Sequence, residues 1–186
     1  MLTSNESKSS LQTITLVHSG DDYFSRLVKM ILESKFEIHI QTYIFDYDST
    51  GKKIIEALKK AAAKNIKIYI LLDGFGSLSF PSEVIDELSK IGIDLRIFSP
   101  FLSANSLYIG RRLHHKIIVS DAKIALIGGI NIADKYRGTE KHGAWLDYAV
   151  EINDENIAKS LQELCSDIYF KNRIIRRKKI SSSYEN

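Results

Sequence analysis

The stretch FEIHIQTYIFDYDSTGKKIIEALKKAAAKNIKIYILL, residues 36–72, decides the fold. Residues 36–45 are rich in β-branched and aromatic side chains, which is typical of a strand buried on at least one face. After a turn, apolar residues recur at helical spacing: Ile54, Ile55, Leu58, Ala61 and Ala62. Residues 66–72 are almost continuously apolar, as in a strand covered on both faces. The stretch therefore predicts a strand–helix–strand unit.

The same alternation of strand and helix extends on both sides of this stretch. Upstream, residues 13–18 have a strand pattern, and from Asp21 the apolar residues take up helical spacing. Downstream, a helix is expected to begin at Pro81 and Ser82, and residues 93–98 form the next expected strand. Three strand–helix–strand units in succession predict right-handed crossovers and a largely parallel sheet that is covered on both faces.

The pattern changes after Pro100. Residues 114–120 and 123–129 both have strand composition and are separated by only two residues, which predicts a β-hairpin. A further strand is expected at 144–152, and Asp154 can cap a last helix. The predicted fold class is therefore α/β, with a mixed, largely parallel central sheet between helical layers.

Composition supports a single compact domain. Of the 186 residues, 44% are hydrophobic and 26% are charged, which argues against a disordered, collagenous or coiled-coil chain. The single cysteine, Cys165, cannot form an internal disulfide, and its place on an apolar helical face predicts that it is buried. No apolar run reaches the roughly 18 residues of a membrane span, and the start of the chain is polar. We therefore expect a cytoplasmic protein.

The net charge of +3 conceals an uneven distribution. Residues 171–186 hold six basic residues and one acid, which leaves a net charge of −2 for residues 1–170. We divide the chain into a flexible N-terminus (1–10), a folded body (11–170) and a basic tail (171–186). The tail has three interpretations: a solvated run of charge, a contact with anionic lipid headgroups, or a contact with nucleic acid.

One segment carries a pattern with chemical meaning: His114, His115 and Lys116, followed by Asp121, Gly128, Gly129 and Asn131. Residues two apart on a strand point to the same face, so His114 and Lys116 are expected to project together while His115 faces the other way. This pair suits phosphate chemistry, because the lysine neutralises an anionic phosphate while the imidazole acts on phosphorus. The two glycines allow the backbone to approach a ligand closely, and Asn131 adds an amide donor.

This spacing, H-x-K-x4-D-x6-G-G-x-N, resembles the signature of the phospholipase D superfamily. Residues 43–77, 114–138 and 145–152 look like the amino-terminal half of bacterial cardiolipin synthases, and the resemblance covers roughly residues 10–170. It implies the α-β-α sandwich of that superfamily and a two-step phosphodiester exchange without metal or other cofactor. One histidine attacks phosphorus to form a phosphohistidine, a second protonates the leaving alcohol, and an alcohol or water resolves the intermediate.

The resemblance also assigns roles to particular residues. The implied catalytic residues are His114, Lys116, Asp121 and Asp147, and the implied phosphate-binding residues are Lys116, Gly128, Gly129 and Asn131. Asp147 is expected to hydrogen-bond the catalytic imidazole and orient it. Asp121 follows a turn, which favours a structural role over a chemical one.

Other residues are placed by pattern around this set. Gln41 and Tyr43 are expected to line the substrate pocket. Asp73 follows a buried strand, where α/β proteins place ligand loops, and a turn-forming role and a substrate role remain equally open for it. Trp145 is assigned to the core.

The superfamily's active site needs two such motifs facing each other across a pseudo-twofold axis, and this sequence contains one. The chain therefore resembles a single-motif half unit that is nearly inactive as a monomer. It is expected either to pair with a complementary half domain or to form a homodimer that places His114 against its symmetry mate.

Three functions remain open. The first is a phosphatidyltransferase or phospholipase that acts on an anionic, phosphatidylglycerol-like lipid, peripheral to the inner face of the cell membrane. The second is a single-motif homodimeric nuclease or phosphodiesterase, and the third is a truncated, non-catalytic half domain. The synthase-like flanks favour the first, whereas the short length favours the second or third. The slightly acidic body weakens the nucleic-acid alternative, because DNA binding draws on a broad basic surface.

Overall fold

The computed structural model describes residues 13–100, 102–103, 106–107 and 111–171. The expected flexible N-terminus and the basic tail after Lys171 lie outside these residues. The first half of the chain forms β1 (Thr13–His18), α1 (Asp21–Glu33), β2 (Glu37–Thr42), α2 (Ser49–Ala62), β3 (Lys67–Asp73), α3 (Ser82–Lys90) and β4 (Ile93–Phe98). The second half forms β5 (Leu102–Ser103), β6 (Ser106–Leu107), β7 (Lys116–Ser120), β8 (Ile124–Gly128), α4 (Asp134–Arg137), β9 (Tyr148–Asn153) and α5 (Glu155–Lys171).

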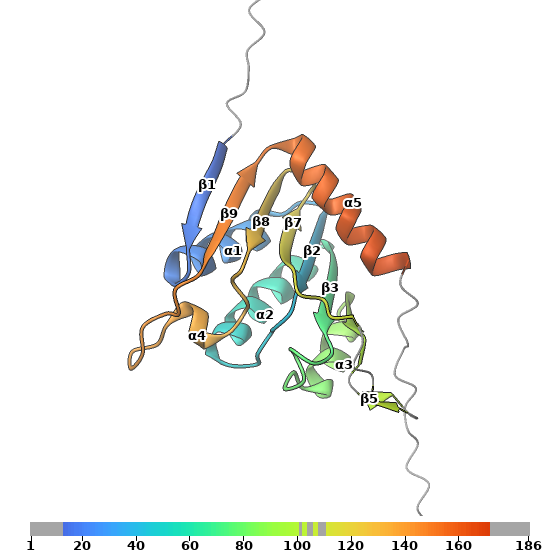
Figure 1. Cartoon of the computed structure of the whole chain (residues 1–186). Helices are drawn as coiled ribbons and strands as arrows, with labels where there is room; N and C mark the ends of the chain where they lie inside the picture. The colour runs from blue at the N-terminus through green and yellow to red at the C-terminus, as the bar shows by residue number, and fades with distance from the viewer. Residues whose placement is uncertain (1–12, 101, 104–105, 108–110, 172–186) are drawn as a thin grey trace, which may run out of the picture.

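Seven of these strands form one mixed sheet in the order β1-β9-β8-β7-β2-β3-β4 (Figure 1). The α/β class and the mixed sheet are therefore confirmed. Parallel pairing is confined to β2, β3 and β4, and the other four pairings in the described sheet are antiparallel. The expected largely parallel character thus holds for one half of the sheet only.

The predicted β7–β8 hairpin explains part of this difference. Three residues rather than the expected two separate β7 from β8, and within the turn that the Lys123 N–H closes on the Ser120 carbonyl, Asp121 and Ala122 have φ values of 55° and 53°. Positive φ at both central positions is the geometry of the two-residue turns that suit the twist of paired strands. β9 then inserts between β8 and β1 and pairs antiparallel with both, so that the second half of the chain builds an antiparallel half-sheet.

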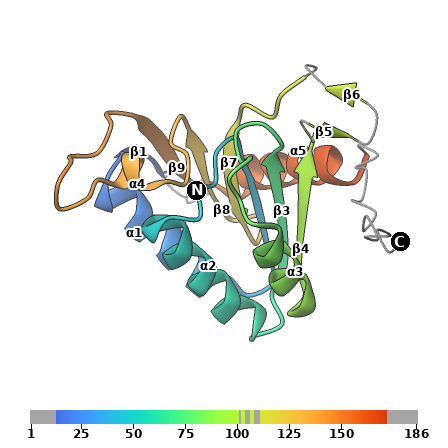
Figure 2. The same cartoon turned by 90° about the horizontal axis from the view of Figure 1, so that it is seen from below.

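Helices cover both faces of the sheet, as an α-β-α sandwich requires. α1, α2 and α3 lie on one face (Figure 2), and with the sheet they enclose the larger apolar core. α5 crosses the other face, where Ala158 and Cys165 pack on Ile117 and Val119 of β7 (Figure 1). Cys165 is fully buried, as its place in the sequence predicts.

The cover that α5 provides is incomplete. Val17 of β1 packs into the larger core, so the alternate residues Ile14 and Leu16 face the α5 side. There they are 58% and 59% exposed, because α5 packs against β2, β7, β8 and β9 rather than β1. Among the described residues, none of the helices combines the length and apolar character needed to cross a membrane.

Candidate active site

The residues of the motif gather at one end of the sheet. β2 and β3 finish at this end, at Thr42 and Asp73, and β7 begins there at Lys116. Lys116 pairs with Gly128, the last residue of β8, and Gly128 in turn pairs with Ala149 at the start of β9. The carboxyl ends of parallel strands are where open α/β sheets bind ligands, and His114 is two residues before β7 at this same end.

His114 and Lys116 lie together here, in contact with Tyr43. The His114 side chain is exposed, and its ring centroid lies 5.1 Å from that of Tyr43. Lys116 is 5% exposed; its Nζ donates to the His114 carbonyl at 2.7 Å and lies 5.5 Å from the centre of the Tyr43 ring. The aromatic ring of Tyr43 therefore supports both the imidazole and the ammonium group, and an anion that reached His114 would meet the lysine charge.

Asp147 lies beside Lys116 and Gly129. Burial lowers the pKa of Lys116 below that of an ordinary lysine, and the negative charge of Asp147 works in the opposite direction. A Cβ atom at Gly129 would collide with the Asp147 carboxylate, so the glycine is what leaves room for this side chain. Asp147 accepts a hydrogen bond from the Tyr148 backbone N–H at 2.7 Å, and no hydrogen bond joins it to His114 within the described parts of the chain.

Ser19 fixes the backbone around Asp147, and the sequence pattern did not single it out. Its hydroxyl donates to the Trp145 carbonyl and accepts from the Asp147 N–H at 3.1 Å, while its own N–H donates to the Asp147 carbonyl at 2.9 Å. The assignment of Trp145 to the core was wrong, because its side chain is 59% exposed. Lys135 lies over the Trp145 indole, 5.1 Å from the ring centre.

Asn131 is buried, and its side chain links two segments of the chain by hydrogen bonds. Its Oδ1 accepts from the Ile44 N–H at 3.0 Å, and its Nδ2 donates to the Tyr136 hydroxyl at 2.8 Å. These bonds tie the segment after β2, which carries Tyr43, to the short helix α4. The sequence pattern did not point to Tyr136, because a tyrosine outside the motif cannot be told from an ordinary core aromatic residue.

Asp73 connects two loops at the same end of the sheet. Its Oδ1 accepts from the N–H groups of Phe75 and Gly76 at 2.8 and 3.0 Å, and its Oδ2 accepts from the Leu113 N–H at 2.8 Å. Both oxygens of this fully buried carboxylate are thus used by backbone. Two roles were left open for Asp73, and the hydrogen bonds support the turn-forming one. Asp73 also holds Leu113, the residue before His114.

Gln41 does not line this site, and that expectation was wrong. Its side chain lies on the α5 face of β2, where Nε2 donates to the Cys165 carbonyl at 2.8 Å and Oε1 contacts His115 Nε2 at 2.7 Å. His115 faces away from His114, as the strand alternation predicts. Burial, and then the positive charge of Lys116, lowers the pKa of His115.

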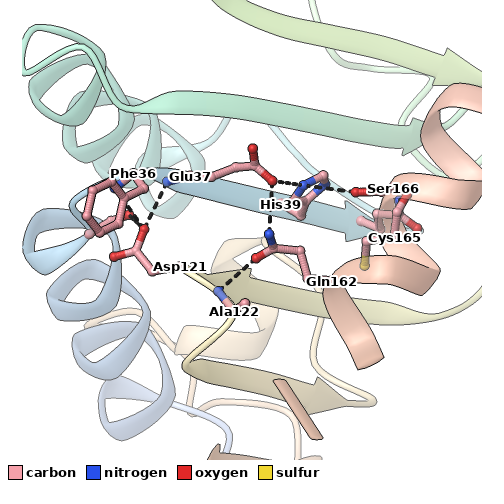
Figure 3. Close-up of polar contacts among 10 residues, drawn as sticks. Phe36, Glu37, His39, Asp121, Ala122, Gln162, Cys165 and Ser166 are labelled. Atoms are coloured by element: carbon pink, nitrogen blue, oxygen red, sulfur yellow. Dashed lines mark hydrogen bonds and ion pairs between the residues drawn. The ribbon is translucent and has the colours of Figure 1, made fainter. Parts of the chain in front are cut away.

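Asp121 lies at the far end of β7 from His114, and Figure 3 shows it beside Phe36 and Glu37. Its carboxylate accepts from the N–H groups of Lys35, Phe36 and Glu37 at 2.8 to 2.9 Å and from the Ser34 hydroxyl at 3.1 Å. Burial would raise the pKa of Asp121, but these hydrogen bonds outweigh it and lower the pKa. The structure therefore separates Asp121 from the implied catalytic set, because its bonds fasten the β7–β8 turn to the start of β2.

Figure 3 also shows how this end of the sheet is fastened to α5. Gln162 accepts from the Ala122 N–H at 2.8 Å and donates to Glu37 at 3.1 Å. Glu37 in turn contacts His39 Nε2 at 2.7 Å, and His39 is fully buried beneath the helix. The motif thus has two physical parts: His114 and Lys116 at the catalytic end, where we propose that the chemistry takes place, and Asp121, whose contacts are structural.

Comparison with known proteins identifies the family of this chain. A family model described as "Cardiolipin synthase, PLD-like domain" matches residues 27–168. Since this is well over half of the chain, the protein belongs to that family, within the phospholipase D superfamily. The expectation drawn from the motif and its flanks is confirmed.

Two curated relatives that this chain matches are cardiolipin synthases that are longer than the chain. Cardiolipin synthase B of Escherichia coli (strain K12) is 34% identical over 151 residues, which are 80% of this chain and 37% of that protein. A cardiolipin synthase of Clostridium perfringens (strain 13 / Type A) is 37% identical over 141 residues, 75% of this chain and 29% of that protein. The chain therefore spans about a third of the length of the curated relatives that it matches.

Solved structures show the same fold at low identity. The phospholipase D family member Nuc from Salmonella typhimurium has a TM-score of 0.61 and 21% identity, over 84% of this chain and 93% of that one. Phosphatidylserine synthase from Haemophilus influenzae Rd KW20 has a TM-score of 0.67 and 15% identity, over 84% of this chain and 36% of that one.

Proposed function

We propose that this chain supplies one half of a phosphodiester-exchange site that works through a phosphohistidine and transfers a phosphatidyl group of an anionic phospholipid. The observation that carries the proposal is the exposed imidazole of His114 beside the buried ammonium group of Lys116 in a chain of the cardiolipin synthase family. The similarity to cardiolipin synthases at 34–37% identity favours lipid over nucleic acid as the substrate class.

In the proposed reaction the His114 imidazole attacks phosphorus and the bond to the leaving alcohol oxygen breaks. A second imidazole gives that oxygen its proton. An incoming alcohol then passes its proton to the same imidazole and attacks the phosphohistidine, which frees His114. Lys116 stabilises the negative charge that builds on the non-bridging oxygens. Asp147 offsets the positive charge of Lys116, and we propose that it also stabilises the imidazolium that forms during the reaction.

The second imidazole is proposed to come from another chain, because the sequence has one such motif. The proposal is a second copy, or a complementary half domain, packed against the catalytic end of the sheet. The exposure of His114 supports this, as does that of Tyr148, next to Asp147 at the same end, which is 42% exposed. A twofold mate packed at this end would bring the two imidazoles together.

The test compares His114→Ala with His115→Ala, a neighbour that faces α5. Each protein is given phosphatidylglycerol vesicles and, separately, single-stranded DNA, and the products are identified by mass spectrometry. We expect lipid products from the parent and from His115→Ala, and a loss of at least a thousandfold in His114→Ala. Full turnover by His114→Ala would overturn the site, and cleavage of DNA alone would overturn the substrate class.

The partner is tested by light scattering at micromolar concentration alongside the activity assay. We expect activity only in preparations that contain a dimer or an added complementary half. A strict monomer with full turnover would contradict the shared site.

A further inference from the structure

The loop between β3 and α3, residues 74–81, lies at the catalytic end of the sheet (Figure 1) and carries exposed apolar side chains. Phe75 is 49% exposed and Leu78 is 60% exposed, whereas Phe80 in the same loop is buried and packs on Phe45, with ring centroids 5.2 Å apart. Phe80 therefore anchors the loop, while Phe75 and Leu78 point to solvent.

The exposure of Phe75 and Leu78 is not the result of a loosely held loop. Asp73 accepts from the Phe75 and Gly76 N–H groups, and the Ser77 hydroxyl donates to the Tyr43 carbonyl at 2.9 Å and accepts from the Phe45 N–H at 3.0 Å. Gly76 approaches the Tyr43 backbone so closely that a Cβ atom there would collide with the Tyr43 carbonyl. The scaffold therefore holds two water-exposed apolar side chains in a fixed place.

The same contacts tie the loop to the catalytic end of the sheet. Ser77 of the loop donates a hydrogen bond to the Tyr43 carbonyl, and the Tyr43 ring packs on His114. Asp73 also holds the Leu113 N–H, one residue before His114. A surface that engaged this loop would therefore lie at a defined position relative to the exposed imidazole.

The charges around the loop favour an anionic surface. Arg111 is exposed, and the Arg112 guanidinium lies 5.7 Å from the centre of the Phe75 ring and 3.8 Å from the Asp73 carboxylate. Asp73 itself is fully buried, and at the surface Asp46 accepts from the Ser79 hydroxyl at 3.0 Å, while Glu83 is exposed just after the loop. Apolar side chains flanked by arginines match the boundary between anionic headgroups and acyl chains.

We propose that the loop 74–81, with Phe75 and Leu78 as inserting side chains, is the surface by which this protein docks on an anionic lipid bilayer. Arg112, which lies over Phe75, and its exposed neighbour Arg111 supply the positive charge. The inference rests on the proposed function, since docking there would bring His114 to a lipid phosphate. Two side chains on one loop tip are too few for a protein interface, which needs about 800 Å² from each partner.

The test measures binding to vesicles and needs no turnover, so its failure is distinguishable from failure of the proposed function. Phe75→Ser/Leu78→Ser in the full chain is compared with Phe36→Ser/Ile91→Ser, which removes two apolar side chains of 68% and 45% exposure at the opposite end of the sheet. Co-sedimentation uses vesicles of phosphatidylglycerol and phosphatidylcholine in equal parts, and vesicles of phosphatidylcholine alone.

We expect the loop variant to bind the mixed vesicles at least tenfold more weakly than the parent, and the control variant to bind within twofold of it. Arg111→Gln is expected to weaken binding to the mixed vesicles about fivefold and to leave binding to phosphatidylcholine unchanged. Circular dichroism confirms that each variant is folded.

Three results would overturn the inference. The first is equal vesicle binding by the loop and control variants. The second is a loss of single-stranded DNA binding in the loop variant without a loss of vesicle binding, which would make the loop a base-stacking surface. The third is a change in oligomeric state confined to the loop variant, which would make it a contact between copies.

Discussion

Replacing Asp121 separates the structural part of the motif from its chemical part. Asp121→Asn keeps an acceptor at Oδ1, which serves Ser34, Phe36 and Glu37, but places an amide where Oδ2 accepts from the Lys35 N–H. Asparagine also tolerates the left-handed backbone at this position, where φ is 55°. The substitution therefore changes the charge and one hydrogen bond and leaves the turn otherwise intact.

The expected loss in the free energy of unfolding follows from those hydrogen bonds. A hydrogen bond to a charged group is worth about 1.5–3 kcal/mol, and here one such bond is lost while the other three become neutral. Because the Lys35 and Phe36 amides are near the surface and water can replace part of the loss, we expect the free energy of unfolding to fall by about 2 kcal/mol. For a chain of this size that is roughly a 4–8 °C drop in Tm. Asp121→Ala, which also strains the turn, should cost more.

The pH dependence has a definite sign. The folded-state pKa of Asp121 is lowered, so its stabilising contribution is fully present above the unfolded value of about 3.9 and is lost as the pH falls through the folded pKa. The difference in unfolding free energy between the parent and Asp121→Asn should therefore be complete at pH 7 and shrink below about pH 4. Urea unfolding followed by circular dichroism, repeated from pH 3 to pH 7, measures it.

The catalytic activity of Asp121→Asn, compared with that of the parent, tests whether the role of Asp121 is structural. Seven residues along an extended chain, at about 3.3 Å each, put Asp121 roughly 20 Å from His114. We therefore expect kcat of folded Asp121→Asn at 25 °C to stay within twofold of the parent. A hundredfold loss of kcat without a change in the free energy of unfolding would refute the structural role that we assign to Asp121.

Three further predictions concern the site and its support. Removing the negative charge in Asp147→Asn should lower the pKa of Lys116 further, so that binding of inorganic phosphate is lost at a lower pH than in the parent; calorimetric titrations from pH 7 to 10.5 would contradict this if the midpoint did not move. Burial raises the pKa of Cys165 to about 12, so a disulfide reagent at pH 8 should label the native thiol at least a hundredfold more slowly than the thiol in urea, and rapid native labelling would show that α5 opens. Ser19→Ala should lower kcat tenfold or more while costing only about 1–2 kcal/mol of unfolding free energy, because it releases the backbone between Trp145 and Asp147; unchanged kcat would deny Ser19 a positioning role.

The local elements followed from the sequence because periodicity reports burial. The alternation at 36–72 placed β2, α2 and β3, and the two-residue gap at Asp121 and Ala122 placed the hairpin. Periodicity does not report which strand lies beside which. The pairing of β1 with β9 therefore could not be predicted, nor could the antiparallel pairings of β7 with β2 and of β9 with β8.

The site could be predicted in part for the same reason. His114 and Lys116 meet because they are two apart along the chain, whereas Ser19 reaches Asp147 only through the arrangement of β1 and β9. Gln41 was misplaced because it faces α5, while Tyr43, just after the strand ends, turns to His114. Contacts between distant segments depend on topology, which a single sequence does not display.

The pairing of β1 with β9 also constrains the order of folding. Thr13 pairs with Asn153, so among the described residues the first strand along the chain pairs with the last. The parallel unit of β2, β3 and β4 needs only neighbouring segments and can form much earlier, whereas closing so long a loop is slow and favours a late step. Until β9 arrives, the edges of β1 and β8 offer unpaired backbone to other chains. A chain truncated between Gly128 and Tyr148 should therefore aggregate through these two strands.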